Sequence, residues 1–275
     1  MNWDRITEKL FLKNGILFAG ENPEISYPSE GNDACFIIED RSFWFNHRAN
    51  FIVQVVKNFP SDGMIFDVGG GNGHVSAVLE KSGFRTTLVE PGIRGVLNAK
   101  QRGLKRLICA TIDSACFPKD SLPAIGVFDV LEHIHEDKKF LVSIREALKP
   151  GGMLYLTVPA YQFLWSAEDE YAGHYRRYTL NGLKKQLEDL GFEIAYATYI
   201  FYFLPVFVFL FRSVPYIFGF KKENSVREFA NDHIVCNKFL RKIIDKVFQS
   251  EIGFVRNKKR IWFGSTCLVA ARAIK

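Results

Sequence analysis

The stretch Ile65-Phe66-Asp67-Val68-Gly69-Gly70-Gly71-Asn72-Gly73 decides the fold of this chain. It passes from an apolar strand through an acidic residue into a loop rich in glycine. Glycines let a chain turn sharply at the end of a strand and bring its backbone close to a ligand. The helix expected at 72–81 offers free backbone N–H groups at its start. The stretch therefore predicts a strand, loop and helix that bind a ligand, and the alternative is a tight turn that binds none.

Two common nucleotide-binding signatures do not fit this loop. In a GxGxxG dinucleotide fingerprint counted from Gly69, the third glycine position holds His74. Counted from Gly71, it holds Ser76, which lies too far from the strand. There is also no GxxxxGK[ST] phosphate loop. These departures argue against a nucleotide-dependent oxidoreductase, which is the rival enzyme class.

Apolar strands alternate with amphipathic helices along most of the chain. Strands are expected at 64–68, 86–90, 106–112, 125–130, 153–159, 192–200 and 266–274, and helices at 43–58, 72–81, 92–101, 137–148 and 180–190. The alternation predicts an α/β fold with a doubly wound, mostly parallel seven-stranded sheet that binds ligands at the carboxyl ends of its strands. We expect residues 1–60 to form an N-terminal cap with a helix and 61–200 the core. Residues 201–264 are a helical, apolar and basic insertion, and 265–275 supply the last strand.

Acidic residues stand at three successive strand ends of this predicted sheet. Asp67 ends the first strand, and Glu90 ends the second about 20 residues beyond the glycine loop. A carboxylate at Glu90 can accept both hydroxyls of a ribose. Asp113 follows the third strand and can accept from an adenine amino group. Together with the glycine loop, the three acids indicate an adenosine-containing ligand.

At this point the chain resembles the class I S-adenosylmethionine-dependent methyltransferases. The resemblance rests on DVGGGNG at 67–73, Glu90, Asp113, FDVLEHIHED at 128–137 and LKPGGMLYLTVP at 148–159, and it covers residues 43–200 plus the last strand. It implies a Rossmann-like methyltransferase fold and S-adenosylmethionine as cofactor. It further implies these cofactor-binding residues: Asp67; Gly69, Gly71 and Gly73 along the methionine and ribose; Glu90 on the ribose; Asp113 on the adenine; and Asp129 near the methionine. The intact loop argues against a catalytically inactive cofactor-binding protein.

The chain is also similar to a narrower bacterial group within that class. The motifs are SFWFNHRAN at 42–50, LWSAEDE at 164–170 and GHYRRYT at 173–179. Members of this group often act on cell-surface glycans or lipid-linked compounds. The resemblance implies a small-molecule, glycan or lipid-linked acceptor, methylated at O or N. Glu168 departs from the group, because relatives often carry His there.

The loop after the fifth strand overhangs the cofactor in this fold and supplies the candidate acceptor site. His174 is the candidate catalytic base, since histidine has an ordinary pKa near 6.5. Arg176 and Arg177 are candidates to clamp a carboxylate or phosphate, and Tyr178 and Trp165 to bind the acceptor. The alternative is that His174, Arg176 and Tyr178 form a hydrogen-bond network that braces the loop.

Two further histidine-containing stretches allow more than one interpretation. Glu132-His133-Ile134-His135-Glu136 resembles a set of metal ligands. The HxH spacing suits a strand better than the start of a helix, and no third ligand cluster stands out, so we expect no metal. His47 and Arg48 are expected to touch the methionine carboxylate or, alternatively, to make a surface salt bridge.

Charge and apolar residues are concentrated toward the C-terminus. Residues 212–275 carry 14 Lys/Arg against 5 Asp/Glu, which favours an anionic partner or a solvated face. Residues 194–211 carry no charge and are dense in aromatics, but the sixth strand needs the first part and Pro205 interrupts the rest. We expect in-plane contact with an anionic membrane. The alternative is a helical lid that packs on the sheet or on a second subunit of a homodimer.

The remaining expectations concern location and nucleic acid. The five cysteines form no CxxC pair, and no signal peptide precedes the core, which favours a cytoplasmic protein, peripheral to the inner face of the membrane if it binds lipid. Nucleic acid is disfavoured as acceptor, because Asp129-Val130-Leu131-Glu132 stands where an Asn/Asp-Pro-Pro-Tyr base-binding motif would lie.

Overall fold

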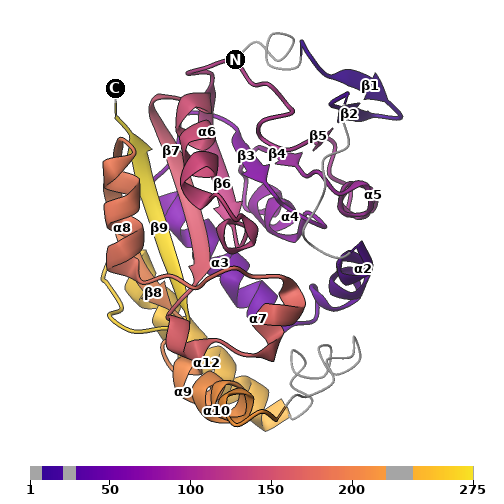
Figure 1. Ribbon diagram of the computed structural model, residues 1–275. Helices are drawn as coiled ribbons and strands as arrows, with labels where there is room; N and C mark the ends of the chain where they lie inside the picture. The colour runs from indigo at the N-terminus through magenta and orange to yellow at the C-terminus, as the bar shows by residue number, and fades with distance from the viewer. Residues whose placement is uncertain (1–7, 21–28, 221–237, 275) are drawn as a thin grey trace.

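A computed structural model describes residues 8–20, 29–220 and 238–274, and a twisted sheet runs through its centre (Figure 1). In the described residues the sheet has nine strands in the order β1-β2-β5-β4-β3-β6-β7-β9-β8. Their bounds are β1 Phe11–Lys13, β2 Ile16–Phe18, β3 Ile65–Val68, β4 Thr86–Val89, β5 Leu107–Cys109, β6 Leu122–Phe128, β7 Leu148–Pro159, β8 Phe192–Ile200 and β9 Thr266–Ala273. The seven predicted strands are present. The predicted count of seven was too low, because a short β1–β2 hairpin extends the edge beside β5.

The sheet is mostly parallel, as predicted. Strands β2, β5, β4, β3, β6 and β7 pair in parallel with one another in that order, and β1 pairs antiparallel with β2. Strand β9 inserts antiparallel between β7 and β8. The loops that follow β3, β4, β5, β6 and β7 therefore leave the same edge of the sheet, and the candidate site residues lie there.

Helices cover both faces of the sheet and make the fold a three-layer α/β sandwich. Helices α6 (Asp137–Ala147) and α8 (Leu180–Asp189) pack on one face, where α8 buries Leu183 and Leu187 one turn apart. Helices α3 (Phe43–Asn58), α4 (His74–Lys81) and α12 (Lys238–Arg256) pack on the other face. Helix α5 (Ile93–Gln101) lies over β4 and β5, and α2 (Ser29–Ile38) lies beside α5.

The predicted insertion at 201–264 contains several helices. They are α9 (Leu204–Val208), the π-helical turn η3 (Phe209–Ser213), α10 (Val214–Ile217) and α12. Helix α12 packs along α3, where the rings of Phe43 and Phe248 stack with centroids 6.0 Å apart. The last part of the insertion is therefore built into the layer that covers the sheet. Residues 221–237 of the insertion, 1–7 and 21–28 of the predicted cap and Lys275 lie outside the described residues.

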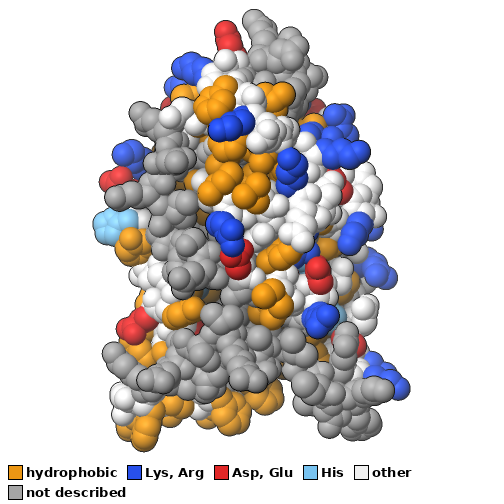
Figure 2. Space-filling model, turned by 90° about the vertical axis from the view of Figure 1, so that its right-hand side faces the viewer, with side chains coloured by type: hydrophobic (Ala, Val, Ile, Leu, Met, Phe, Trp, Pro, Cys, Tyr) orange, Lys and Arg blue, Asp and Glu red, His pale blue; other side chains and the backbone are white. Residues whose placement is uncertain are grey.

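Apolar side chains are exposed at the end of the molecule formed by α9, η3 and α10. Figure 2 shows hydrophobic side chains gathered at the lower end, where Figure 1 places α9 and α10. We call this surface the aromatic end; its exposed residues are Val206, Phe207, Phe209, Leu210, Phe211, Ile217, Phe218, Phe220, Trp262 and Phe263. Among the described residues, no helix combines the length and the apolar character that crossing a membrane requires.

Candidate functional site

The loop after β3 takes its shape from three glycines with positive φ. Gly69, Gly71 and Gly73 have φ of 71°, 53° and 73°. A Cβ atom on Gly69 would lie 2.6 Å from Val130, and one on Gly73 would lie 2.6 Å from Leu104. A Cβ atom on Gly71 would meet nothing within 4 Å. Gly69 and Gly73 therefore allow the loop to pack closely, whereas Gly71 borders open space.

Glu90, which directly follows β4, holds this loop in place. Its carboxylate accepts hydrogen bonds from the backbone N–H of Gly71 (2.9 Å) and of Gly92 (2.7 Å). The side chain is buried, and burial raises the pKa of Glu90 to about 7. Each carboxylate oxygen has a second lone pair, so Glu90 can still accept donors from a ligand beside Gly71.

Asp67 lies beneath the same loop. It is the third residue of β3 and is buried, and its carboxylate accepts a hydrogen bond from the Ser76 hydroxyl of α4 at 2.7 Å. Burial raises the pKa of Asp67 to about 6. These contacts tie the strand to the helix that follows the glycine loop.

Asp113 does not end a strand, contrary to the sequence prediction. Strand β5 stops at Cys109, and Asp113 is exposed in the turn beyond it. The strand ends early because Ser114 closes a local turn: its hydroxyl accepts from the Thr111 N–H at 2.9 Å. Asp113 still lies beyond the carboxyl end of β5, on the same edge as Glu90.

A partly buried ion pair lies where β6 ends. Asp129, with a φ of 55°, accepts hydrogen bonds from the Arg48 guanidinium and from the Thr157 hydroxyl (3.0 Å). Arg48 is buried on α3, and its guanidinium carbon lies 4.7 Å from the centre of the Trp44 ring. Its Nε has no hydrogen-bond partner among the described residues. The surface salt bridge considered for Arg48 is therefore wrong, whereas His47 pairs with Asp245 of α12 at 3.2 Å.

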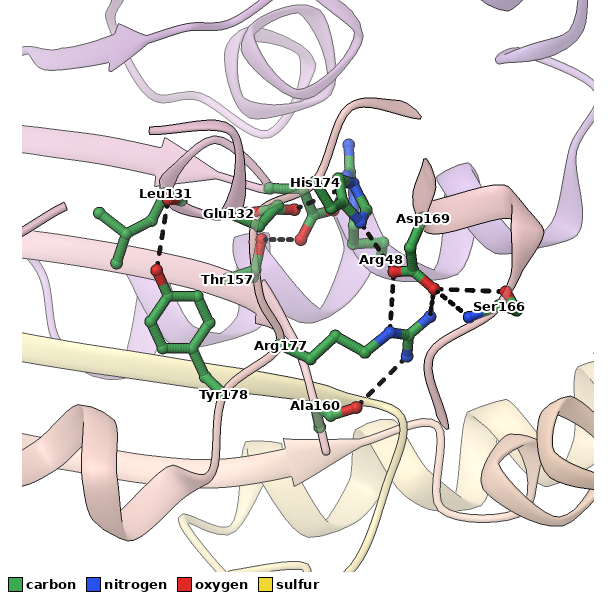
Figure 3. A network of polar contacts seen from close by, with 11 residues as sticks. Arg48, Leu131, Glu132, Thr157, Ala160, Ser166, Asp169, His174, Arg177 and Tyr178 are labelled. Atoms are coloured by element: carbon green, nitrogen blue, oxygen red, sulfur yellow. Dashed lines mark hydrogen bonds and ion pairs between the residues drawn. The ribbon is translucent and has the colours of Figure 1, made fainter. Parts of the chain in front are cut away.

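The loop after β7 is organised around Asp169 of α7 (Ala167–Ala172), as Figure 3 shows. One oxygen of the buried Asp169 carboxylate lies 2.8 Å from Nδ1 of His174. The same carboxylate accepts from Nε (2.8 Å) and Nη2 (2.9 Å) of Arg177, whose Nη1 donates to the Ala160 carbonyl at 3.3 Å. Burial alone would raise the pKa of Asp169, but the hydrogen bonds of His174 and Arg177 bring it below its usual value.

Arg176 and Tyr178, the neighbouring candidates for acceptor binding, also bond to groups of the protein. Arg176 donates to the His135 carbonyl at 2.7 Å and pairs with Asp137 at 3.2 Å. The Tyr178 hydroxyl donates to the Asp137 carboxylate at 3.0 Å. Both arginines and Tyr178 thus contact groups of the protein itself, as the bracing alternative expects. Trp165 is half-buried where α7 begins.

Sequence reasoning gave no role to two buried acids of this region. Asp169 stands inside the quoted 164–170 motif, and the Ser166-x-x-Asp169 capping box was its only local signal. Glu132, three residues after Asp129, is buried and faces His174. The partners of Asp169 lie within eight residues of it in sequence, whereas Glu132 faces His174 only when two loops far apart in sequence come together.

A family model described as a methyltransferase domain matches residues 43–197, which include the glycine loop, Glu90, Asp129 and the loop after β7. The chain belongs to this family. The cofactor of this methyltransferase is S-adenosylmethionine.

Relatives agree with this assignment. A ubiquinone biosynthesis O-methyltransferase of Paramagnetospirillum magneticum is 29% identical over 99 residues, 34% of this chain and 40% of the relative. The match thus spans less than half of that protein. An S-adenosylmethionine-dependent methyltransferase of Thermotoga maritima has a TM-score of 0.56 at 16% identity, covering 88% of this chain and 95% of its own. The plantazolicin methyltransferase BamL, solved with S-adenosylhomocysteine, has a TM-score of 0.55 at 15% identity, covering 91% and 92%. These structures share the fold.

Proposed function

We propose that this methyltransferase transfers a methyl group from S-adenosylmethionine to an oxygen or nitrogen of a small-molecule, glycan or lipid-linked acceptor. One observation carries the proposal. A glycine loop held by Glu90 and the partly buried pair of Arg48 and Asp129 lie on one edge of the sheet. The loop suits a nucleoside, and the ion pair suits the amino and carboxylate groups of an amino acid. The name of the Paramagnetospirillum relative supports oxygen as the atom methylated.

The residues on this edge fit the cofactor part by part. Gly71 leaves room for the ribose, and Glu90 would accept its hydroxyls. Asp113, exposed beyond β5, would accept from the adenine amino group. Asp129 would hold the methionine amino group, and Nε of Arg48 would donate to the methionine carboxylate. Asp67, Gly69 and Gly73 would support the loop from below.

Methyl transfer requires the protein to position the acceptor and to remove one proton from it. When bound, S-adenosylmethionine supplies a methyl group on a sulfonium, and the bond to sulfur breaks with its electrons left on sulfur. The chain must place the acceptor in line, exclude water and remove the proton of an acceptor hydroxyl. We propose that His174 acts on that proton, because Asp169 engages Nδ1 and leaves Nε2 for the acceptor.

We infer that the loop after β7 is positioned by Arg176, Arg177 and Tyr178. These side chains influence acceptor binding through the loop and do not touch the acceptor. Their polar groups already bond to Asp169, Asp137 and backbone carbonyls. Trp165 remains the proposed wall of the acceptor pocket.

Calorimetry with S-adenosylmethionine and, separately, with NAD tests the cofactor. We expect binding of S-adenosylmethionine alone, and binding of NAD alone would overturn the proposal. Methyl transfer is then followed with labelled S-adenosylmethionine and extracts that contain quinols, glycans or lipids. His174→Ala should lose transfer and keep cofactor affinity, with His135→Ala as the matched control. A joint loss of thermal stability and cofactor affinity in His174→Ala would instead assign it to the bracing network.

The aromatic end supports a second part of the proposal, peripheral contact with an anionic membrane. Its rings form a continuous series: Phe263 lies near Tyr161, which stacks on Phe163, which contacts Phe209. The exposed basic residues Lys258, Lys259 and Arg260 directly precede Ile261 and Trp262. Exposed aromatics beside cations suit an anionic bilayer surface and would bring a lipid-linked acceptor to the enzyme.

A further inference from the structure

Three potential metal ligands meet beside the proposed acceptor site. Glu132, His133 and His174 each offer one ligand atom, and these atoms lie within 4.8 Å of one another. Glu132 and His133 belong to the short 3-10 helix η1 (Leu131–His133), and His174 follows α7. The Tyr175 N–H donates to the Glu132 carbonyl at 2.8 Å, which fixes the two segments together.

One oxygen of the carboxylate in this cluster lacks a partner. Glu132 is 1% exposed, and its Oε2 accepts no hydrogen bond from the described residues. Its Oε1 lies 4.0 Å from Nε2 of His174. A buried carboxylate oxygen without a donor is costly, and a bound cation would offset that cost.

Asp169 orients one imidazole of the cluster, and the second imidazole lies beside it. Asp169 accepts from Nδ1 of His174, which leaves the lone pair of Nε2 directed toward Glu132. A carboxylate that orients a histidine in this way is the usual outer partner of a metal-ligating imidazole. The His133 ring lies edge-on to that of His174, with centroids 4.7 Å apart.

The grouping differs from the HxH pair considered in the sequence. His135 lies outside the cluster and packs edge-on against Tyr175 at 5.2 Å. The third ligand, His174, is 41 residues after His133 in sequence. Spacing along the chain therefore indicated Glu132 and His133 but gave no signal for His174.

We propose, against our sequence-based expectation of no metal, that Glu132, His133 and His174 bind a divalent cation of the zinc class and leave one coordination position open. Two imidazoles and one carboxylate are a ligand set typical of zinc, and three protein ligands leave a place for water or substrate. The role of the ion rests on the proposed function. An acceptor hydroxyl bound at the open position would have a lowered pKa and release its proton to water. In this refinement His174 acts as a metal ligand in place of the base role proposed above, and the ion lowers the pKa of the acceptor hydroxyl.

Metal binding is tested on the full chain after removal of metal with a chelator. Calorimetry should show one Zn²⁺ per chain and weaker binding of Mg²⁺. With Co²⁺ as a probe, the visible spectrum should show a low-coordinate site without thiolate bands, which excludes the cysteines. Glu132→Gln and His174→Ala should each weaken Zn²⁺ binding at least tenfold. Asp169→Asn should weaken it about 10- to 100-fold, as loss of an orienting partner does. His135→Ala is the matched control and should bind as the wild type does.

The proposed metal site is overturned if Zn²⁺ does not bind stoichiometrically. It is also overturned if the wild type and His174→Ala bind Zn²⁺ with equal affinity. If the variants fail to fold, the Co²⁺ spectrum of the wild type decides, because a spectrum of hydrated Co²⁺ excludes the site. S-adenosylmethionine binding is measured on the same samples. Its retention without Zn²⁺ binding refutes the metal site alone, whereas its absence refutes the proposed function.

Discussion

At the scale of single residues, the glycines after β3 differ in what surrounds them, and their substitutions should separate binding from stability. Gly71→Ala points a methyl group into open space. It should lower the free energy of unfolding by about 1–2 kcal/mol, because alanine must adopt a left-handed backbone there. We expect this variant to fold and to lose at least tenfold in S-adenosylmethionine affinity. Gly73→Ala adds contacts of 2.6 Å with Leu104 and 2.9 Å with Ala99 and should lose more stability. Urea unfolding and calorimetry measure both; equal stability losses would contradict this division.

Glu90 should make cofactor binding depend on pH. Its pKa is raised to about 7, so the carboxyl group becomes protonated as the pH falls below that value. A protonated carboxyl loses acceptor capacity for the ribose hydroxyls, so affinity should fall by up to about tenfold per pH unit below about 7 and level off above it. Glu90→Gln should bind more weakly, with no pH dependence in this range. Calorimetry between about pH 6 and 8 checks it, and a parallel slope in Glu90→Gln would assign the dependence to another group.

At the scale of elements, the loop after β7 depends on the fork between Arg177 and Asp169. Arg177→Lys keeps the charge and loses the two parallel hydrogen bonds. Because Asp169 is buried, we expect a loss of about 1.5–3 kcal/mol in the free energy of unfolding. Arg176→Lys, at a more exposed pair with Asp137, is the matched control and should lose less than about 1 kcal/mol.

The same variant distinguishes the two roles considered for Arg177. Urea unfolding measures stability, and steady-state kinetics measure the KM for an acidic acceptor. If Arg177→Lys keeps wild-type stability while the KM rises, the arginine clamps the acceptor and the bracing role is wrong.

Elements with a local signal were predictable from the sequence, and contacts between loops were not. Helix α3 and strand β8 have their predicted bounds, because apolar periodicity is contained within each element. The β1–β2 hairpin was missed because its strands have three residues each, too few to show alternation. Among site residues, Glu90 was found from its spacing after the glycine loop. Asp169 was not, since the turn that brings it against His174, five residues later in the same loop, shows no pattern in the sequence.

At the scale of the whole molecule, the exposed apolar surface is formed by different elements from the sheet edge that we propose binds the cofactor. The aromatic end is formed mainly by α9, η3 and α10, which follow β8. The ring series through Phe163 and Tyr161 connects it to the loop after β7. An acceptor with an apolar tail held at the aromatic end would therefore have its head group close to the proposed acceptor site.

This arrangement predicts binding to vesicles that contain anionic lipid. The protein should co-sediment with anionic vesicles at low salt, less at high salt, and little with neutral vesicles, because each Lys or Arg near the surface contributes about 1 kcal/mol. Phe211→Ser combined with Trp262→Ser removes two rings that are 72% and 80% exposed and should weaken binding without loss of stability. Leu12→Ser, 71% exposed on β1, is the matched control. Wild-type protein that stays in the supernatant at low salt and is monomeric by ultracentrifugation would refute membrane contact, whereas a dimer dissociated by the double variant would assign the aromatic end to a second copy of the chain.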